Sequence, residues 1–227
     1  MKIVFDTTSG VDTRSWECLI TATCIPGDES VDELFAGGWL FDPISTRWYM
    51  ARSVRIDLAK WEAGKSATKA VDHYVWNRIN SPNAEDEELL RAYRRERDIM
   101  DYRYDTFKEI GEVYFERGES RSGNCWYMTT HCDTVSAYFG PAFTKDGTKT
   151  SPGKACLTRA CQVSKERGSS HLYVYEGYGS TNAYKVDYSG FEWWAGDRWT
   201  DDKNLYLKCL REDFKDMTGV FDIRADT

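Results

Sequence analysis

The chain has 227 residues, of which 41% are hydrophobic and 15% aromatic, a composition typical of a globular protein with a sizeable buried core. Its formal net charge of −7 argues against broad, nonspecific adhesion to nucleic acid, although a local basic patch could still neutralise a few phosphates. The sequence has no run of about 18 apolar residues and no basic region followed by an apolar run at its start, so we expect a cytoplasmic protein without a membrane span.

The seven cysteines are scattered along the chain and form no CxxC pair, and the three histidines fall outside the spacing of zinc sites. This pattern predicts reduced, buried thiols and no structural metal.

The first part of the chain contains two segments with a clear pattern. Residues 31–38 are amphipathic and end in two glycines, while residues 53–59 alternate apolar and polar side chains as a half-buried strand does. A polar stretch at residues 80–88 then separates a first segment, residues 1–80, from a second, residues 81–227.

Residues 86–118 are predicted to be helical in two pieces. Apolar side chains recur at helical spacing in both pieces, at Leu89, Ala92, Tyr93 and Met100 and then at Phe107, Ile110 and Tyr114. Five arginines crowd the same stretch, at positions 91, 94, 95, 97 and 103. Because the stretch is also rich in Glu and Asp, a solvated helical face is favoured over a surface that contacts tRNA.

Two strands are predicted at residues 124–130 and 134–143, joined by a turn at His131, Cys132 and Asp133. These three residue types can build a nucleophilic site. Adjacent residues on a tight turn rarely converge on one reacting atom, so a plain turn is the favoured interpretation.

The next segment predicts a helix followed by a strand. Ser151 suits the N-cap, Pro152 the first helical position and Gly168 the terminator of a helix that ends near Arg167. A strand follows at residues 171–178. Strand, helix and strand in this order predict a crossover unit with parallel strands, and therefore an α/β fold with a mixed sheet.

The start of this helix is a candidate phosphate site formed by Ser151, Gly153 and Lys154, because the free N–H groups of a helix N-terminus attract anions. Gly153 and Ala155 fit the pattern (Q/R)xxGx(G/A), by which acetyltransferases of the GNAT superfamily hold the pyrophosphate of coenzyme A. Thr150 stands where that pattern has a basic or amide residue. A capped structural helix explains the same residues at least as well.

The segments that follow resemble the arginyl-tRNA–protein transferase family. That family has a strand ending in YLGY, then a YKxxF/YxPxE segment, then a Gly and a Trp. In the same order this chain has LYVYEGY, AYK and GDRW, and upstream it has LFAGGW and SVRIDLAKW where the family has LL..GW and VRI.VA.F. The resemblance covers roughly residues 31–199.

The chain departs from the family pattern at three places. Gly190 replaces the family's proline, and the loop between Tyr178 and Tyr184 is several residues shorter. Residues 50–52 stand where the family has cysteines.

The resemblance implies an aminoacyltransferase with a GNAT acetyltransferase-like catalytic core, residues 81–227, on which residues 1–80 pack. It implies transfer of an amino acid, with arginine favoured, from charged tRNA to the amine of a protein N-terminus, a peptide or a small molecule. No cofactor is needed beyond the aminoacyl-tRNA, because its ester is already activated. The protein would align the amine, remove a proton and stabilise the oxyanion.

The matched segments supply the candidate site residues. Tyr184 and Lys185 are the candidate catalytic pair, because neither strand periodicity nor solubility demands them. The candidate residues for binding the aminoacyl group or the substrate have charged or aromatic side chains near the matched segments: Arg55, Glu176, Tyr178, Asp187, Tyr188 and Glu192. Tyrosines on strands, Tyr188 among them, more often pack in the core, and Arg55 or Glu192 could form ordinary ion pairs.

Two other functions remain open. An acyl-CoA-dependent N-acyltransferase on the same fold would use acetyl-CoA, and it would show convergent backbone N–H groups near Gly153 beside a splayed pair of strands. A non-catalytic binding module would show a closed or aromatic-filled cleft.

Overall fold

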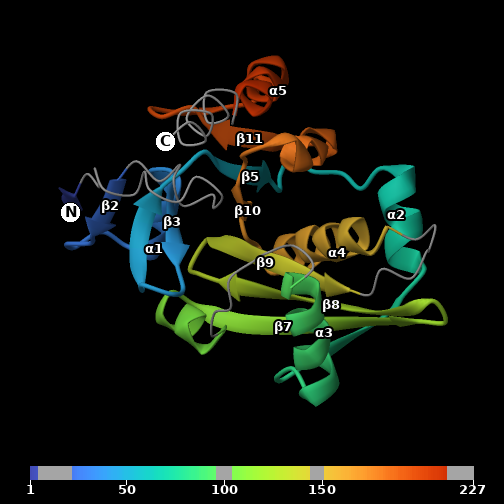
Figure 1. Ribbon diagram of the computed structural model, residues 1–227. Helices are drawn as coiled ribbons and strands as arrows, with labels where there is room; N and C mark the ends of the chain where they lie inside the picture. The colour runs from blue at the N-terminus through green and yellow to red at the C-terminus, as the bar shows by residue number, and fades with distance from the viewer. Residues whose placement is uncertain (5–21, 96–103, 144–150, 214–227) are drawn as a thin grey trace, which may run out of the picture.

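The computed structural model describes residues 1–4, 22–95, 104–143 and 151–213, and it contains a large mixed sheet and a small antiparallel sheet (Figure 1). The strands of the large sheet lie in the order β12 (Trp199–Thr200), β11 (Phe191–Trp194), β5 (Ser53–Asp57), β10 (His171–Glu176), β9 (Val135–Phe143), β8 (Gly123–His131), β7 (Glu112–Ser120) and β6 (Val75–Ile79). Those of the small sheet lie in the order β1 (Lys2–Val4), β2 (Ala22–Ile25), β4 (Arg47–Met50) and β3 (Trp39–Asp42). The predicted α/β fold with a mixed sheet is confirmed.

Helical segments connect these strands. The α-helices are α1 (Val31–Ala36), α2 (Lys65–Asp72), α3 (Ala84–Arg95), α4 (Pro152–Glu166) and α5 (Lys203–Glu212), and the 3₁₀ segments are η3 (Tyr104–Glu109) and η4 (Ser180–Asp187). No helix within these described ranges is long and apolar enough to cross a membrane. The six cysteines in the same ranges are free thiols.

The crossover unit forms as predicted. Strands β9 and β10 are parallel, and the pairs on either side of them are antiparallel. Helix α4, which connects them, has Pro152 in its first turn and ends before Gly168, whose φ of +85° is readily adopted only by glycine. Ser151 occupies the N-cap position, but its side chain makes no capping hydrogen bond with the described residues.

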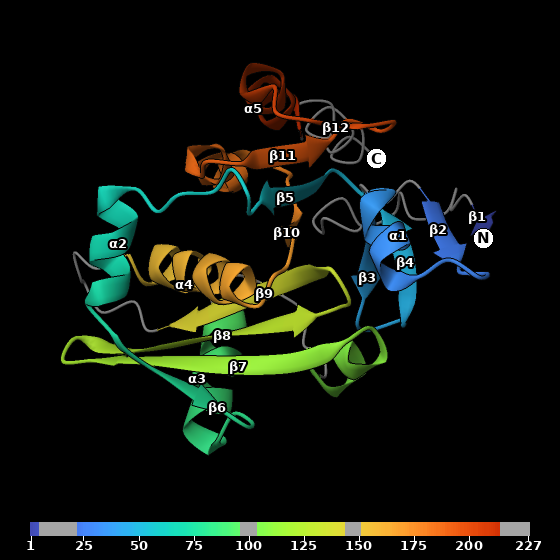
Figure 2. The same ribbon diagram turned by 180° about the vertical axis from the view of Figure 1, so that it is seen from behind.

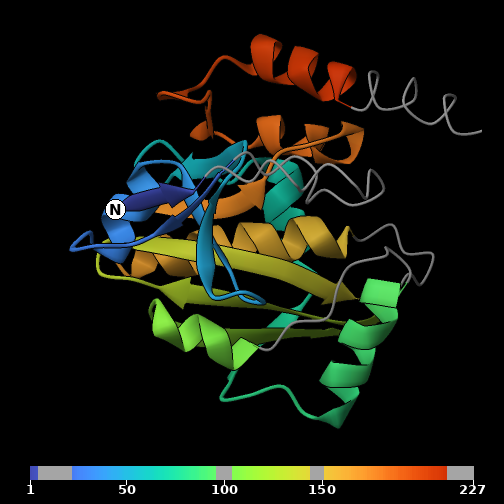
Figure 3. The ribbon, with the colours of Figure 1, turned by 60° about the vertical axis from the view of Figure 1, so that its left-hand side comes forward.

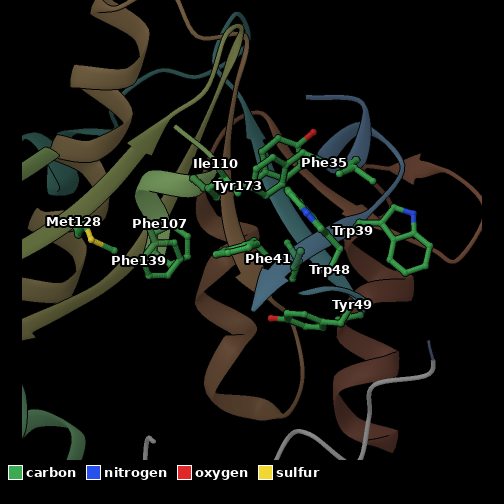
Figure 4. Close-up of a cluster of buried hydrophobic side chains, with 14 of the residues drawn as sticks. Phe35, Trp39, Phe41, Trp48, Tyr49, Phe107, Ile110, Met128, Phe139 and Tyr173 are labelled. Carbon is green, nitrogen blue, oxygen red and sulfur yellow. The ribbon is translucent and has the colours of Figure 1, made fainter. Parts of the chain in front are cut away.

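The large sheet is covered on both faces, so alternate residues of its strands enter two different cores. In β9, Tyr138 packs with α4 on one face, whereas Ala137 and Phe139 pack on the other face against α3, η3 and the small sheet. Figures 1 and 2 show α4 and α3 on opposite sides of β7 to β9. Figure 4 shows the second core, where Phe107 lies between Phe139 and Phe41, with ring centroids 3.6 Å and 5.9 Å apart.

The predicted helix over residues 112–118 is wrong, because these residues form β7 between β6 and β8. The apparent helical face from Phe107 through Ile110 to Tyr114 combined residues from two elements, the end of η3 and the start of β7. The β-branched and aromatic run from Val113 to Phe115 favours a strand, and pairing on both edges stabilises it.

Strands from both sides of residue 80 share the large sheet. Strand β5, from the first segment, lies between β10 and β11, and β6 forms one edge. The division of the chain into residues 1–80 and residues 81–227 stays a prediction.

Candidate functional site

The two parallel strands separate toward their C-terminal ends. Pairing between β9 and β10 joins residues 135–137 to residues 171–173, and beyond these β9 continues beside β8 alone. Helix α4 begins at this end, because Gly153 in its first turn lies beside Phe143, the last residue of β9. A Cβ added to Gly153 would lie 3.4 Å from the Phe143 ring. Figure 3 shows α4 lying over β8 and β9. In open α/β sheets, ligands bind outside the carboxyl ends of such strands, so this end is the candidate site.

The end of β10 is irregular. Its register with β5 shifts between Tyr173 and Glu176, and Tyr175 has a φ of +57°, which is rare for a bulky residue. The Tyr175 hydroxyl donates a hydrogen bond to the Phe41 carbonyl at 3.0 Å, and its ring contacts Phe139 at a centroid distance of 4.4 Å. Aromatic rings from β9 and β10 therefore meet across the gap on the face away from α4.

Lys185 stabilises this irregular strand end. The side chain is buried, and its Nζ donates hydrogen bonds to the carbonyl oxygens of Val174, at 2.7 Å, and Glu176. These bonds join η4 to the irregular end of β10. Tyr184, its neighbour and predicted partner, is 49% exposed at the surface of η4, but its hydroxyl points toward protein, and burial raises the pKa of this hydroxyl to about 12.

Burial lowers the pKa of Lys185 from 10.5 to about 8, against the opposing effect of Glu176. Between these two pH values the unfolded lysine holds a proton that the folded one has released, so this group makes stability rise with pH across that window, by about 3 kcal/mol in total. Urea titrations at several pH values give the free energy of unfolding of the wild type and of Lys185→Met. We expect the wild-type value minus the variant value to rise between about pH 7.5 and about pH 10. A difference that stays constant over this range would show that the lysine titrates normally.

Glu176 and Tyr178 are both held by neighbouring residues. The Tyr49 hydroxyl donates a hydrogen bond to the Glu176 carboxylate, whose pKa is raised by burial (Figure 4 shows Tyr49). The Tyr178 hydroxyl accepts a hydrogen bond from the Arg52 backbone N–H at 2.7 Å, and the Arg52 guanidinium lies 4.9 Å from the ring centroid of Tyr178. The same guanidinium pairs with Asp213 at 2.8 Å.

Arg55 and Glu192 face the other side of the large sheet from α4. They are direct cross-strand partners on β5 and β11, and their side chains form an ion pair at 2.7 Å with 13% and 14% exposure. The Arg55 guanidinium also lies 4.1 Å from the ring centroid of Trp199. Each charge therefore already has a partner within the fold.

The remaining candidates differ in burial. Tyr188 is buried in the core beneath α4, whereas Asp187 is exposed at the end of η4. Ser151 is exposed, and Gly153 and Lys154 lie partly buried in the first turn of α4. The predicted polar loop before them, which includes Thr150, lies outside the described residues.

The arginine-rich stretch behaves largely as a solvated helical face. Arg91 and Arg95 pair with Glu88 on the exposed side of α3, whereas Arg94 is buried. The arginines at positions 97 and 103 lie outside the described residues.

The structure thus brings together Glu176, Tyr178 and Lys185 at the end of β10, and it places Arg55 with Glu192 in an ion pair on the face away from α4. Sequence reasoning did not assign Tyr49 or Tyr175 to this region. Tyr49 lies 127 positions from Glu176, and no local pattern indicates that the two meet.

No protein-family model and no curated protein matches the sequence. Among solved structures, L-PGS from Bacillus licheniformis matches with 13% identity and a TM-score of 0.40, over 62% of this chain and 47% of that one. The C-terminal domain of a putative lysylphosphatidylglycerol synthetase from Agrobacterium fabrum matches with 10% identity and a TM-score of 0.41, over 56% and 46% of the two chains. A GCN5-related glucosamine N-acetyltransferase region of a fungal multi-domain β-N-acetylglucosaminidase matches with 13% identity and a TM-score of 0.41, over 75% and 23%. This chain therefore spans less than half the length of each of the three, and a likeness this distant assigns no family.

Proposed function

We propose that the chain is an acyltransferase that moves an aminoacyl group from charged tRNA to an amine. The observation that carries the proposal is the β9–α4–β10 unit, in which the helix N-terminus lies at the end where two parallel strands separate. A helix N-terminus favours a donor that carries phosphate, and strands that separate leave their end groups open to a ligand.

The aromatic contact across the gap argues against coenzyme A as the donor, and it is also the feature that a non-catalytic binding module would show. A pantetheine arm that passed between the strands would have to displace Phe139 and Tyr175, whose rings are in contact. A terminal adenosine with its aminoacyl ester could instead approach from the side of α4. Acyl transfer from coenzyme A is the second candidate, supported by the separated strands and by Gly153.

In the proposed reaction the acceptor nitrogen attacks the ester carbonyl. A C–N bond forms, the bond to the ribose oxygen breaks, and the proton lost by the amine passes to that oxygen. We assign the hydroxyl of Tyr184, a residue that is half exposed on η4, to contact with the reacting groups. Lys185 holds the end of β10 in place, as a positioning residue.

The test is transfer of radiolabelled amino acid from purified arginyl-tRNA, and from a mixed pool of charged tRNAs, to peptides beginning with Asp or Glu and to small amines. Labelled acetyl-CoA is assayed in parallel. We expect transfer from tRNA, reduced at least tenfold in Tyr184→Phe and unchanged in Tyr114→Phe, a matched loss of hydroxyl near the far end of α4. Transfer from acetyl-CoA alone would establish the second candidate, and no transfer from either donor would indicate a binding module.

A further inference from the structure

The carboxylate of Glu176, the last residue of β10, has one oxygen bound and the other open. Its Oε1 accepts a hydrogen bond from the Tyr49 hydroxyl, which fixes the orientation of the carboxylate. Its Oε2 makes no hydrogen bond with the described residues, and this oxygen is not sealed from solvent, since Glu176 is partly exposed. The second oxygen is therefore within reach of a ligand.

This carboxylate also lacks a cation of its own. No ion pair joins it to a side chain of the described residues. Lys185 is near enough to lower the pKa of Glu176, but its ammonium donates to two backbone carbonyl oxygens of β10 and not to the carboxylate. A largely buried carboxylate without a cation is costly, so a positively charged ligand group is the partner that Oε2 lacks.

The surroundings add a further negative charge. The end of β3 lies beside the end of β10, because the Tyr175 hydroxyl donates to the Phe41 carbonyl at 3.0 Å. Asp42 follows Phe41, and its charge contributes to the raised pKa of Glu176. The oxygens of Asp42 already accept the backbone N–H groups of the turn at residues 44 and 45. Asp42 therefore strengthens the local attraction for a cation without competing to bind it.

A single open oxygen suits an ammonium group better than a guanidinium. A guanidinium binds a carboxylate most strongly through two parallel N–H bonds, which need both oxygens. The Tyr49 hydroxyl already occupies Oε1. An ammonium is a compact charge with three donors, and it can bind one oxygen at full strength.

We propose that Oε2 of Glu176 binds a primary ammonium group of a substrate. This inference rests on the proposed function, in which two groups have this chemistry: the acceptor amine before it loses its proton, and the α-ammonium of the aminoacyl donor. Glu176 is placed for either, because it follows the irregular part of β10, beyond the point where β9 and β10 separate. Tyr49 acts as a positioning residue through the orientation of the carboxylate.

The experiment compares probes that differ by one positive charge, at about pH 7. The donor pair is an alanyl and a propionyl group, each joined by an amide to 3′-amino-3′-deoxyadenosine, and calorimetry gives their dissociation constants. The acceptor pair is n-butylamine and n-butanol, titrated by protein NMR. The proteins are the wild type, Glu176→Gln, Tyr49→Phe and the control Glu119→Gln, which loses a half-exposed carboxylate on β7. Transfer from charged tRNA is assayed alongside.

We expect the wild type and Glu119→Gln to bind the charged member of one pair about tenfold more tightly than the uncharged member, as one hydrogen bond to a charged group provides. The pair that shows this preference identifies the substrate that supplies the ammonium. Glu176→Gln keeps an acceptor for Tyr49 but removes the charge, so it should reduce the preference to about twofold or less. Tyr49→Phe keeps the charge but not its orientation, and should reduce the preference to about threefold.

A merely structural role of Glu176 would change the affinity for both members of a pair equally and leave the preference intact. A preference that survives in Glu176→Gln would therefore overturn the inference, as would equal binding, or no binding, of both pairs by the wild type. Either result together with transfer from charged tRNA would leave the proposed function standing. A preference that depends on Glu176, without transfer from any charged tRNA, would overturn the proposed function alone.

Discussion

Replacing Arg159 with methionine is expected to lower the free energy of unfolding by about 3 kcal/mol, because it leaves a buried carboxylate without its cation. Arg159 lies on α4, and its Nε and Nη2 bind the two oxygens of Glu116 on β7 at 2.9 Å and 3.1 Å. Glu116 is 8% exposed, and its other partner is the hydroxyl of Tyr127 at 2.6 Å. The pair joins the inner face of α4 to the large sheet, so its loss should also loosen the helix whose N-terminus borders the candidate site.

Urea denaturation of two further variants tests this explanation. The double variant Arg159→Met/Glu116→Gln removes the charge but keeps an acceptor for Tyr127, and should recover most of the lost stability. Arg91→Met breaks a pair with Glu88 in which both side chains are at least half exposed, and should change stability by less than about 0.5 kcal/mol. If the single and double variants were equally unstable, the loss would come from packing and not from an unpaired charge.

Replacing Gly190 with alanine is expected to destabilise the fold by about 3 kcal/mol or more, because backbone strain and a steric clash act together. Gly190 has a φ of +73°, and an added Cβ would lie 2.3 Å from the carbonyl oxygen of Asp57. The Asp57 N–H donates to the Gly190 carbonyl at 2.8 Å, so the two backbones cannot separate without losing this bond between β5 and the start of β11. Proline cannot adopt this φ at all, so Gly190→Pro should prevent folding.

The matched control is Gly168→Ala. Gly168 has a φ of +85°, but no atom of the described chain lies within 4 Å of its added Cβ, so only the backbone strain of about 1 kcal/mol applies. Thermal melts and urea titrations of both variants separate strain from clash. If both variants lost the same free energy of unfolding, the close approach of the added Cβ to the Asp57 carbonyl would cost nothing. The same geometry explains why this position is glycine.

Local pattern predicted those elements whose residues form one periodic segment. The strand that begins at Ser53, the hairpin of β8 and β9, and α4 with its terminator Gly168 were all predicted, because their signals lie within each segment. Strand β7 was missed because its pairing with β6 and β8 identifies it as a strand, and this pairing is not visible in the local sequence pattern.

The candidate site was predicted only in part. Lys185 stood out in the sequence, but its hydrogen bonds depend on the irregular backbone at Tyr175, which no propensity indicates. Tyr49 of β4 meets Glu176 across 127 positions, and on its own it reads as an ordinary core residue. Residues that meet only through tertiary packing leave no spacing in the sequence to recognise.

The position of β5 has a consequence for synthesis on the ribosome. Both of its partners in the sheet, β10 and β11, lie more than about 110 residues later in the chain. At roughly 5–20 residues per second, the emerging β5 has both edges unpaired for about 6–20 s before either partner can reach it. The small sheet, β8 and β9 can form in that interval, but the sheet that unites them cannot close until translation has passed residue 194. A strand with both edges unpaired over such a period is a target for chaperones, and a nascent chain stalled between residues 60 and 170 should be held by them.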